Sequence, residues 1–160
     1  MYDRILVALD GSPLAEQALP HAIAQAERFE SELVLLRVLE PLRLSSAVSP
    51  AAMELAEEQA RRLVAIEAGQ ERTQFLAEEY LEWIAARVEE HGVPVRAVTV
   101  EGRSHQEIIR FAESNQIDLI VICSRGASGL SRWLMGSVAD RVVRAARMPV
   151  LLVPPQKQEP

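Results

Sequence analysis

Five short apolar runs, separated by segments with helical spacing, constrain the fold of this chain more than any other feature. Val, Ile and Leu dominate these runs, which cover residues 4–9, 33–39, 95–100, 118–123 and 148–153. Near-continuous apolar runs are typical of strands covered on both faces, and parallel strands need a crossover, usually a helix, between them. The alternation therefore predicts an α/β fold with a five-stranded parallel sheet and helices on both faces. The third run alternates with polar residues, which places it nearer an edge of the sheet.

Helix-start and helix-breaking residues between the runs support this alternation. Ser12 is suited to cap a helix and Pro13 to occupy its first turn, so a helix is expected after the first run, with a kink or a lost hydrogen bond at Pro20. Segment 51–91 is rich in Ala, Glu, Arg and Leu and predicts helix, but Gly69 leaves one long bent helix and two consecutive helices both open. Two shorter helices are expected over 106–115 and 137–147.

Length and charge limit the kind of protein to which this fold can belong. At 160 residues, the chain is expected to form a single domain over residues 1–154, followed by a flexible tail at 155–160. The net charge of −6 gives no reason to expect nucleic acid or an anionic membrane as partner, and no apolar stretch reaches membrane-spanning length. Because the first strand begins close to Met1, no signal peptide is expected, and a single cysteine excludes an internal disulfide. A cytoplasmic protein is the expectation.

The fifteen residues 123–137 are the part of the sequence most suited to hold a ligand. They contain three glycines, four serines and two arginines, between the fourth strand and the last helix. Glycine lets the backbone approach a ligand closely, and the start of a helix offers unpaired N–H groups to an anion, so phosphate is the first candidate. Lys157 is the only lysine, so positive charge near a phosphate must come from arginine, a metal ion or backbone N–H groups.

Asp10 is a second polar feature at the end of a predicted strand. In doubly wound sheets, ligands bind beyond the carboxyl ends of the strands, where the strand order reverses, so Asp10 and residues 123–137 would face one crevice if their strands are neighbours. A dinucleotide-binding domain would place G-x-G-x-x-G where this chain has D-G-S-P. A phosphoryl-accepting receiver domain would need an acidic cluster there and a lysine after the fifth strand, and the sequence has neither.

Four stretches of the sequence carry a resemblance to a known family. They are I-L-V-A-L-D-G-S (5–12), S-P-L-A-E-Q-A-L (12–19), I-D-L-I-V-I-C-S-R-G (117–126) and G-S-V-A-D-R-V-V-R-A-A-R-M-P-V-L-L-V (136–153). Together they resemble the universal stress protein family over essentially the whole chain. Members that bind ATP carry the pattern G-x2-G-x9-G-[ST] after the fourth strand. Gly126, Gly136 and Ser137 fit this pattern, whereas Cys123 occupies the position of its first glycine.

The resemblance implies a Rossmann-like sheet with strand order 3-2-1-4-5, which places Asp10 beside the glycine-rich segment. It further implies that Asp10 meets the ribose of ATP, that the backbone near Val38 meets the adenine, and that Gly126, Gly136 and Ser137 hold the phosphates together with Mg²⁺. It implies a cytoplasmic homodimer, active in stress response or signalling, whose nucleotide state alters its interactions with partners. The dimer contact would be the fifth strand, formed by Val150, Leu151, Leu152 and Val153.

Several of these residues also have an interpretation that needs no ligand. Ser137 and Asp140 form S-x-x-D, a helix-capping signature, and Asp10 could serve only to form a turn. Arg125 and Arg132 are either phosphate contacts or solvated charges, and Cys123 is either a pocket residue or a small buried hydrophobe ending a strand. A dimeric interaction module that binds no nucleotide is therefore the alternative function.

The sequence contains no convincing nucleophile or general base, so fast catalysis is not expected. The resemblance allows slow ATP hydrolysis or autophosphorylation. The three histidines lie far apart in the sequence, with no spacing typical of a metal site. No protein metal site is expected for this reason.

Overall fold

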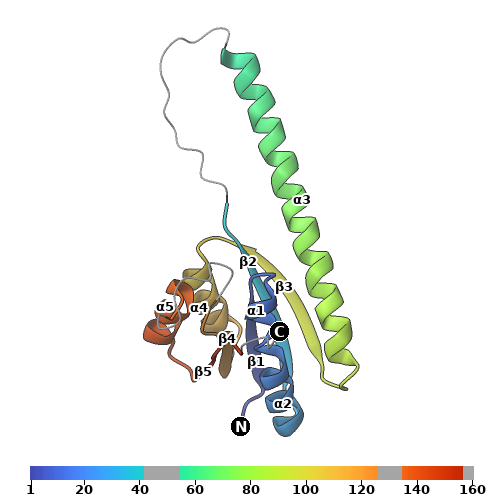
Figure 1. Ribbon diagram of the computed structural model, residues 1–160, viewed down its shortest axis with the longest axis vertical. Helices are drawn as coiled ribbons and strands as arrows, with labels where there is room; N and C mark the ends of the chain where they lie inside the picture. The colour runs from blue at the N-terminus through green and yellow to red at the C-terminus, as the bar shows by residue number, and fades with distance from the viewer. Residues whose placement is uncertain (42–54, 126–134, 157–160) are drawn as a thin grey trace.

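The computed structural model describes residues 1–41, 55–125 and 135–156, and of residues 55–59 it describes only the backbone. Five parallel strands form one sheet in the order β3-β2-β1-β4-β5 (Figure 1). The strands are β1 (Arg4–Leu9), β2 (Glu32–Leu39), β3 (Val95–Glu101), β4 (Leu119–Cys123) and β5 (Val150–Val153). The predicted fold class and strand order are confirmed, and β3 is an edge strand as its alternating sequence indicates.

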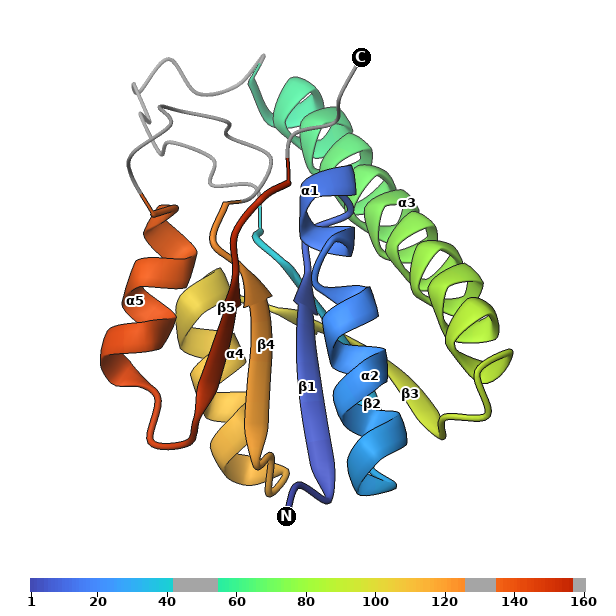
Figure 2. The same ribbon diagram turned by 60° about the horizontal axis from the view of Figure 1, so that its bottom comes forward.

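Helices cover both faces of the sheet (Figure 2). They are α1 (Pro13–Glu16), α2 (Leu19–Phe29), α3 (Leu55–Glu89), α4 (Ser104–Ser114) and α5 (Ser137–Ala145). The first three helices lie on one face, and α4 and α5 lie on the other. This arrangement is the doubly wound one, in which the chain moves outward from β1 to one edge and then returns through β4 to the other.

The central strands β1 and β4 are almost entirely apolar because each has a helical layer on either side. In β1, Ile5, Val7 and Leu9 are buried against α1, α2 and α3. The intervening residues Leu6 and Ala8 are buried against α4 and α5. Successive side chains of a strand point to opposite faces, so a strand between two layers of helices must be apolar at every position.

The helical segment after β1 is divided in two at residues 17 and 18. Ser12 caps the first part as predicted, its hydroxyl accepting a hydrogen bond from the backbone N–H of Ala15 at 3.2 Å. Pro20 has no N–H to donate to the carbonyl of Glu16, so α1 ends at Glu16 and Pro20 falls in the first turn of α2. Proline therefore separates two helices here, where the sequence predicted one disturbed helix.

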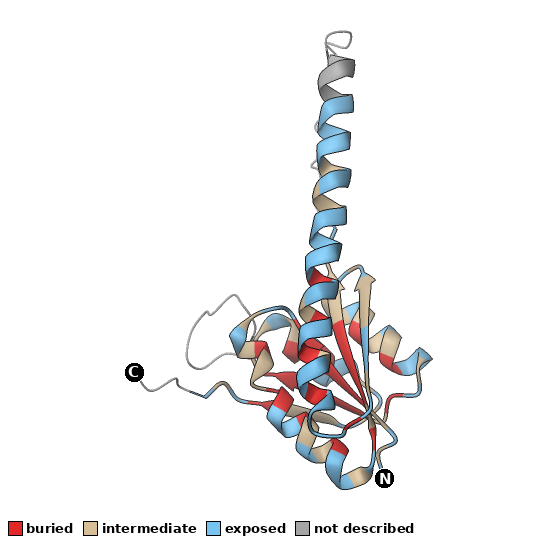
Figure 3. Ribbon diagram, turned by 90° about the vertical axis from the view of Figure 1, so that its right-hand side faces the viewer, coloured by how far each residue is buried: buried red, intermediate tan, exposed pale blue. Residues whose placement is uncertain are grey.

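Segment 55–89 forms one helix, α3, with Gly69 inside it, which decides between the two alternatives. Its C-terminal half is buried against the sheet through Ala77, Leu81, Ile84 and Val88. Its N-terminal half extends past the sheet and is largely exposed along its length (Figure 3). A single glycine costs a helix interior about 1 kcal/mol relative to alanine, which is too little to end a helix of this length.

Candidate functional site

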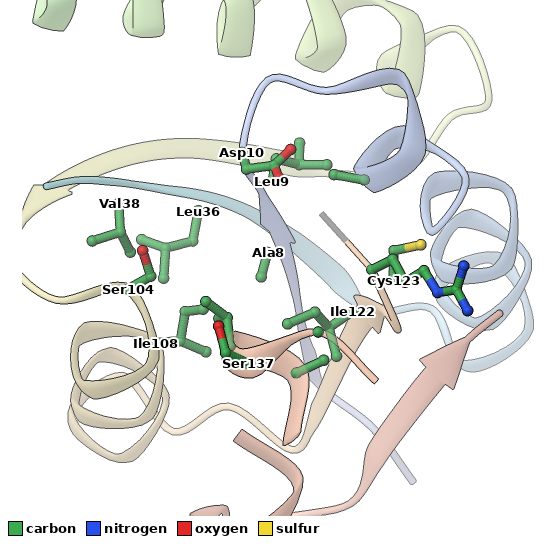
Figure 4. A pocket seen from close by; sticks show the side chains of 15 residues that line it. Ala8, Leu9, Asp10, Leu36, Val38, Ser104, Ile108, Ile122, Cys123 and Ser137 are labelled. Atoms are coloured by element: carbon green, nitrogen blue, oxygen red, sulfur yellow. The ribbon is translucent and has the colours of Figure 1, made fainter. Parts of the chain in front are cut away.

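A pocket of about 200 Å³ lies at the carboxyl ends of β1, β2 and β4, where the strand order reverses (Figure 4). The pocket is lined by residues of these three strands, of the segments that follow them, and of α1, α4 and α5. They are Ala8, Leu9, Asp10, Ala15, Leu36, Val38, Ser104, Ile108, Ile122, Cys123, Arg125, Gly136, Ser137, Val138 and Ala139. The pocket occupies the position at which doubly wound sheets bind their ligands.

One wall of this pocket is apolar and is built by the sheet and α4. Ala8, Leu36, Val38 and Ile122 come from the three strands, and Ile108 comes from α4. Figure 4 shows Val38, Leu36 and Ile108 toward one end of the pocket and Ile122 toward the end near Cys123, with Ala8 between them. An apolar wall with a few polar groups at its rim suits a ligand that has a flat apolar part and a polar or charged end.

Asp10 lines the pocket and also shapes the turn that follows β1. Its carboxylate oxygen Oδ1 accepts a hydrogen bond from the backbone N–H of Ser12 at 2.8 Å. The next residue, Gly11, has a φ of +83°, and a Cβ built there would lie 3.0 Å from the guanidinium of Arg37. The turn-forming interpretation of Asp10 is thus correct, and the turn places Asp10 at the pocket rim.

Arg37 connects this turn to the long helix. Its guanidinium lies over the ring of Tyr80 in α3, 5.2 Å from the ring centre. The hydroxyl of Tyr80 donates a hydrogen bond to the carboxylate of Glu16 at the end of α1, at 3.1 Å. Burial, followed by the nearby charge of Glu16, raises the pKa of Tyr80, so its hydroxyl stays protonated and able to donate. Contacts among Arg37 of β2, Tyr80 of α3 and Glu16 of α1 therefore lie next to the Asp10 turn and help to hold it in place.

The start of α5 faces the same pocket, and no side-chain hydrogen bond caps it. Gly136 is the N-cap residue, with extended backbone, and Ser137 is the first helical residue. The predicted cap by Ser137 and Asp140 is wrong, because Ser137 lies one residue inside the helix and the Asp140 carboxylate instead accepts hydrogen bonds from Arg144 at 2.9 and 3.0 Å. Backbone N–H groups in the first turn thus have no intrahelical partner, and the positive end of the helix dipole is directed at the pocket rim.

Two backbone hydrogen bonds hold this helix start against the end of the sheet. The N–H of Gly136 donates to the carbonyl of Ser124 at 2.7 Å, and the N–H of Ser124 donates to the carbonyl of Val153 at 2.7 Å. The α5 N-terminus is therefore tied to the residue after β4 and, through it, to β5. These contacts fix its position relative to Asp10 and the apolar wall.

Cys123 and Arg125 form the side of the pocket next to β4. Cys123 is the last residue of β4 and is 4% exposed, so it is a small buried residue that ends a strand and also lines the pocket. Arg125 is half-buried and brings a positive charge to the lining. Gly126 and Arg132, the other predicted phosphate contacts, lie outside the described residues.

Ser104 is a pocket residue that the sequence analysis missed. It begins α4, and both its backbone N–H and its hydroxyl donate to the Oε1 atom of Glu40, at 3.1 and 2.8 Å. These two hydrogen bonds lower the pKa of Glu40, and the neighbouring charges of His105 and Arg103 lower it further. The signal available in the sequence was the position of Ser104 three residues after the end of β3, at the same edge of the sheet as Asp10.

The described residues contain no group of three or more His, Cys, Asp or Glu side chains placed to hold a metal ion. Within the same ranges, no helix is both long and apolar enough to cross a membrane.

In the part of the tail that is described, the backbone N–H of Gln156 donates to the side chain of Gln17 at 2.6 Å. Residues 157–160 are not described.

Comparisons with known proteins agree on one family for this chain. A sequence model of the universal stress protein family matches residues 1–154. Universal stress protein MJ0531 of Methanocaldococcus jannaschii is 34% identical over 159 residues, covering 99% of this chain and 86% of the relative. The solved structure of MJ0577, from the same organism, has a TM-score of 0.79 at 28% identity and covers 99% of each chain. A universal stress protein in complex with cAMP shares the fold with a TM-score of 0.67 at 20% identity, covering 97% of this chain and 98% of that one. The chain belongs to the universal stress protein family.

Proposed function

We propose that this protein binds ATP with Mg²⁺ in the pocket at the ends of β1, β2 and β4, and acts as a cytoplasmic stress-response or signalling protein. The observation that carries this proposal is the meeting of three features in one pocket: an apolar wall, the Asp10 carboxylate and the N-terminus of α5. An apolar base, a ribose and a phosphate chain need these three kinds of surface. Residues 1–154 would form one domain around this pocket.

Each part of the nucleotide has a corresponding part of the pocket in this proposal. The adenine lies against the apolar wall near Val38, and the ribose hydroxyls lie near Asp10. The phosphates lie at the start of α5, where Gly136 and Ser137 offer backbone N–H groups and Arg125 offers positive charge. The universal stress protein that holds cAMP supports the choice of an adenine nucleotide.

The residues of the pocket fit a magnesium ion that arrives with the phosphates. Mg²⁺ usually keeps several waters and binds to the phosphate oxygens of its nucleotide, so it needs few protein ligands here, and the Asp10 carboxylate stays with the ribose. The ion would neutralise part of the phosphate charge. Arg125 and the α5 N-terminus would neutralise the remainder.

We expect Gly136→Val to weaken Mg-ATP binding by about tenfold or more, because a branched side chain at the helix start obstructs the approach of the phosphates to the N–H groups. Isothermal titration calorimetry on the purified protein measures this change. Gly69→Val is the control, since Gly69 lies in α3 and a Cβ added there would meet no atom within 4 Å. Absence of heat with the parent protein, or equal affinity in parent and Gly136→Val, would rule out phosphate binding at this helix.

A dimeric interaction module without nucleotide is the second candidate, and Cys123 is the observation that favours it. Its side chain lines the pocket at the position where ATP-binding relatives carry the first glycine of their pattern. If the thiol obstructs the ligand, Cys123→Gly gains affinity for Mg-ATP in the same titration. If Cys123→Gly and the parent both bind no Mg-ATP, the interaction module is the better description.

We also propose that the protein forms a homodimer through β5, the edge strand opposite β3. In the described part of the chain, β5 pairs with β4 on one side and has no strand on the other. Val150, Leu151 and Leu152 are half-buried apolar residues at this edge, and an apolar edge strand needs a partner or protection.

Leu152→Asp is expected to convert the dimer to a monomer, because it places a charge within the apolar contact. Light scattering after size-exclusion chromatography gives the molar mass. Val143→Asp on the exposed surface of α5 is the control, since Val143 is 42% exposed and is not part of β5. A monomeric parent at about 100 µM would contradict the dimer, whatever the variants do.

A further inference from the structure

Ser104 lies in the pocket wall at the end where we place the base. It contributes to the lining next to Val38 and Ile108, and Figure 4 shows the three side chains close together. Its backbone N–H and its hydroxyl O–H both donate to Oε1 of Glu40, at 3.1 and 2.8 Å. Both donors of Ser104 are therefore already used inside the protein.

The direction of these hydrogen bonds is set by the charge of Glu40. An ionised carboxylate has no proton and only accepts hydrogen bonds, so Ser104 must be the donor in both. The hydrogen bonds from the backbone and the side chain of Ser104 lower the pKa of Glu40, so its carboxylate is ionised at neutral pH. A serine hydroxyl has one proton and two lone pairs, and with the proton committed it offers only lone pairs to the pocket.

We propose that Ser104, held by Glu40, is a specificity-determining hydrogen-bond acceptor that selects a 6-aminopurine over a 6-oxopurine. This inference rests on the proposed function, because it concerns the base of a nucleotide in the same pocket. The amino group of adenine donates to the Ser104 oxygen. The carbonyl oxygen of hypoxanthine or guanine at the same position would face a lone pair of the Ser104 oxygen and, beyond it, the negative charge of Glu40. It would find no hydrogen-bond donor there.

The same arrangement sets the orientation of the nucleotide. The N-termini of α4 and α5 are both near the pocket, but Glu40 supplies an anion of the protein itself at the start of α4. A phosphate at that end would face this carboxylate. The phosphates are therefore directed to α5 and the base to Ser104.

Calorimetry with Mg-ATP and Mg-ITP tests this inference, because the two nucleotides differ in the amino or oxo group at position 6 and in the proton that the oxo form carries on the adjacent N1. We expect the parent to bind ATP at least about tenfold more tightly than ITP, since the oxo group of ITP finds no hydrogen-bond donor at Ser104. In Glu40→Ala the proton of Ser104 is free to turn toward either ligand, so the ratio of the two affinities is expected to fall below about threefold.

Glu101→Ala is the matched control. It removes a neighbouring carboxylate, at the end of β3, that has no hydrogen bond to Ser104. The ratio of affinities in this variant should equal that of the parent. Circular dichroism and thermal unfolding confirm that each variant is folded before titration.

The possible results separate this inference from the function on which it rests. If the parent binds neither nucleotide, both are wrong. If the parent binds ATP and ITP equally, or if Glu40→Ala and Glu101→Ala keep the same preference for ATP, nucleotide binding stands and the assignment of Ser104 and Glu40 is wrong.

Discussion

Leu81→Ala is expected to lower the free energy of unfolding by about 2–5 kcal/mol, the range for a leucine removed from a closely packed core. Leu81 lies in the buried half of α3, is 1% exposed, and packs in the cluster that joins α3 to β1, α2 and β2. The substitution deletes buried methyl groups and leaves a cavity that the surrounding helices cannot fully close. Urea denaturation followed by circular dichroism measures the change.

The same substitution at Leu63 provides the control within one helix. Leu63 lies in the half of α3 that extends past the sheet and is 55% exposed. Leu63→Ala removes the same atoms but little buried surface, so it should change the unfolding free energy by no more than about 0.5 kcal/mol. Equal losses at the two positions would contradict the packing of α3 shown in Figure 3.

The fold could be predicted from the sequence because its strands are short and most of their positions are apolar. Such runs, each separated by a helical segment, leave little choice other than a parallel sheet between two layers of helices. The strand order came from the family resemblance, since spacing alone does not say which strands are neighbours. The sequence did not decide whether α3 is one helix or two. A glycine ends a helix only in a suitable capping arrangement, and the residues around Gly69 do not show whether one forms.

The pocket was predictable where it is built from residues that directly follow strands. Asp10, Cys123 and Arg125 were identified because the carboxyl ends of parallel strands meet at one edge of the sheet. Glu40 and Ser104 are separated by 64 positions, and their contact depends on the register of β2 and β3, in which Leu39 is paired with Glu101. Sequence patterns do not determine that register. The prediction that Ser137 caps α5 was wrong for a similar reason. The start of α5 is held by the hydrogen bond between Gly136 and Ser124, a contact between segments that sequence patterns do not reveal.

Glycine-to-alanine substitutions at two positions are expected to change stability in opposite directions. Gly102, between β3 and α4, has a φ of +145°, a region that residues with a side chain rarely adopt. A Cβ there would lie 2.6 Å from Cγ of Glu107, which is too close to the main stem of that side chain for a small adjustment to relieve. Gly102→Ala should therefore destabilise the protein by about 2–3 kcal/mol, combining backbone strain with the displacement of Glu107.

The second position, Gly69, lies in the interior of α3, where a Cβ would meet no atom within 4 Å. Gly69→Ala should stabilise the protein by up to about 1 kcal/mol, because alanine loses less backbone freedom than glycine when it enters a helix. The double variant Gly102→Ala/Glu107→Ala separates the steric cost at Gly102 from the backbone strain, because it removes the contact with Glu107 and keeps the strained φ. Only part of the stability lost in Gly102→Ala should therefore return. Urea denaturation of all three variants measures these differences. A stabilised Gly102→Ala would mean that the chain before α4 tolerates a side chain, and the backbone that presents Ser104 to the pocket would then differ from the one described.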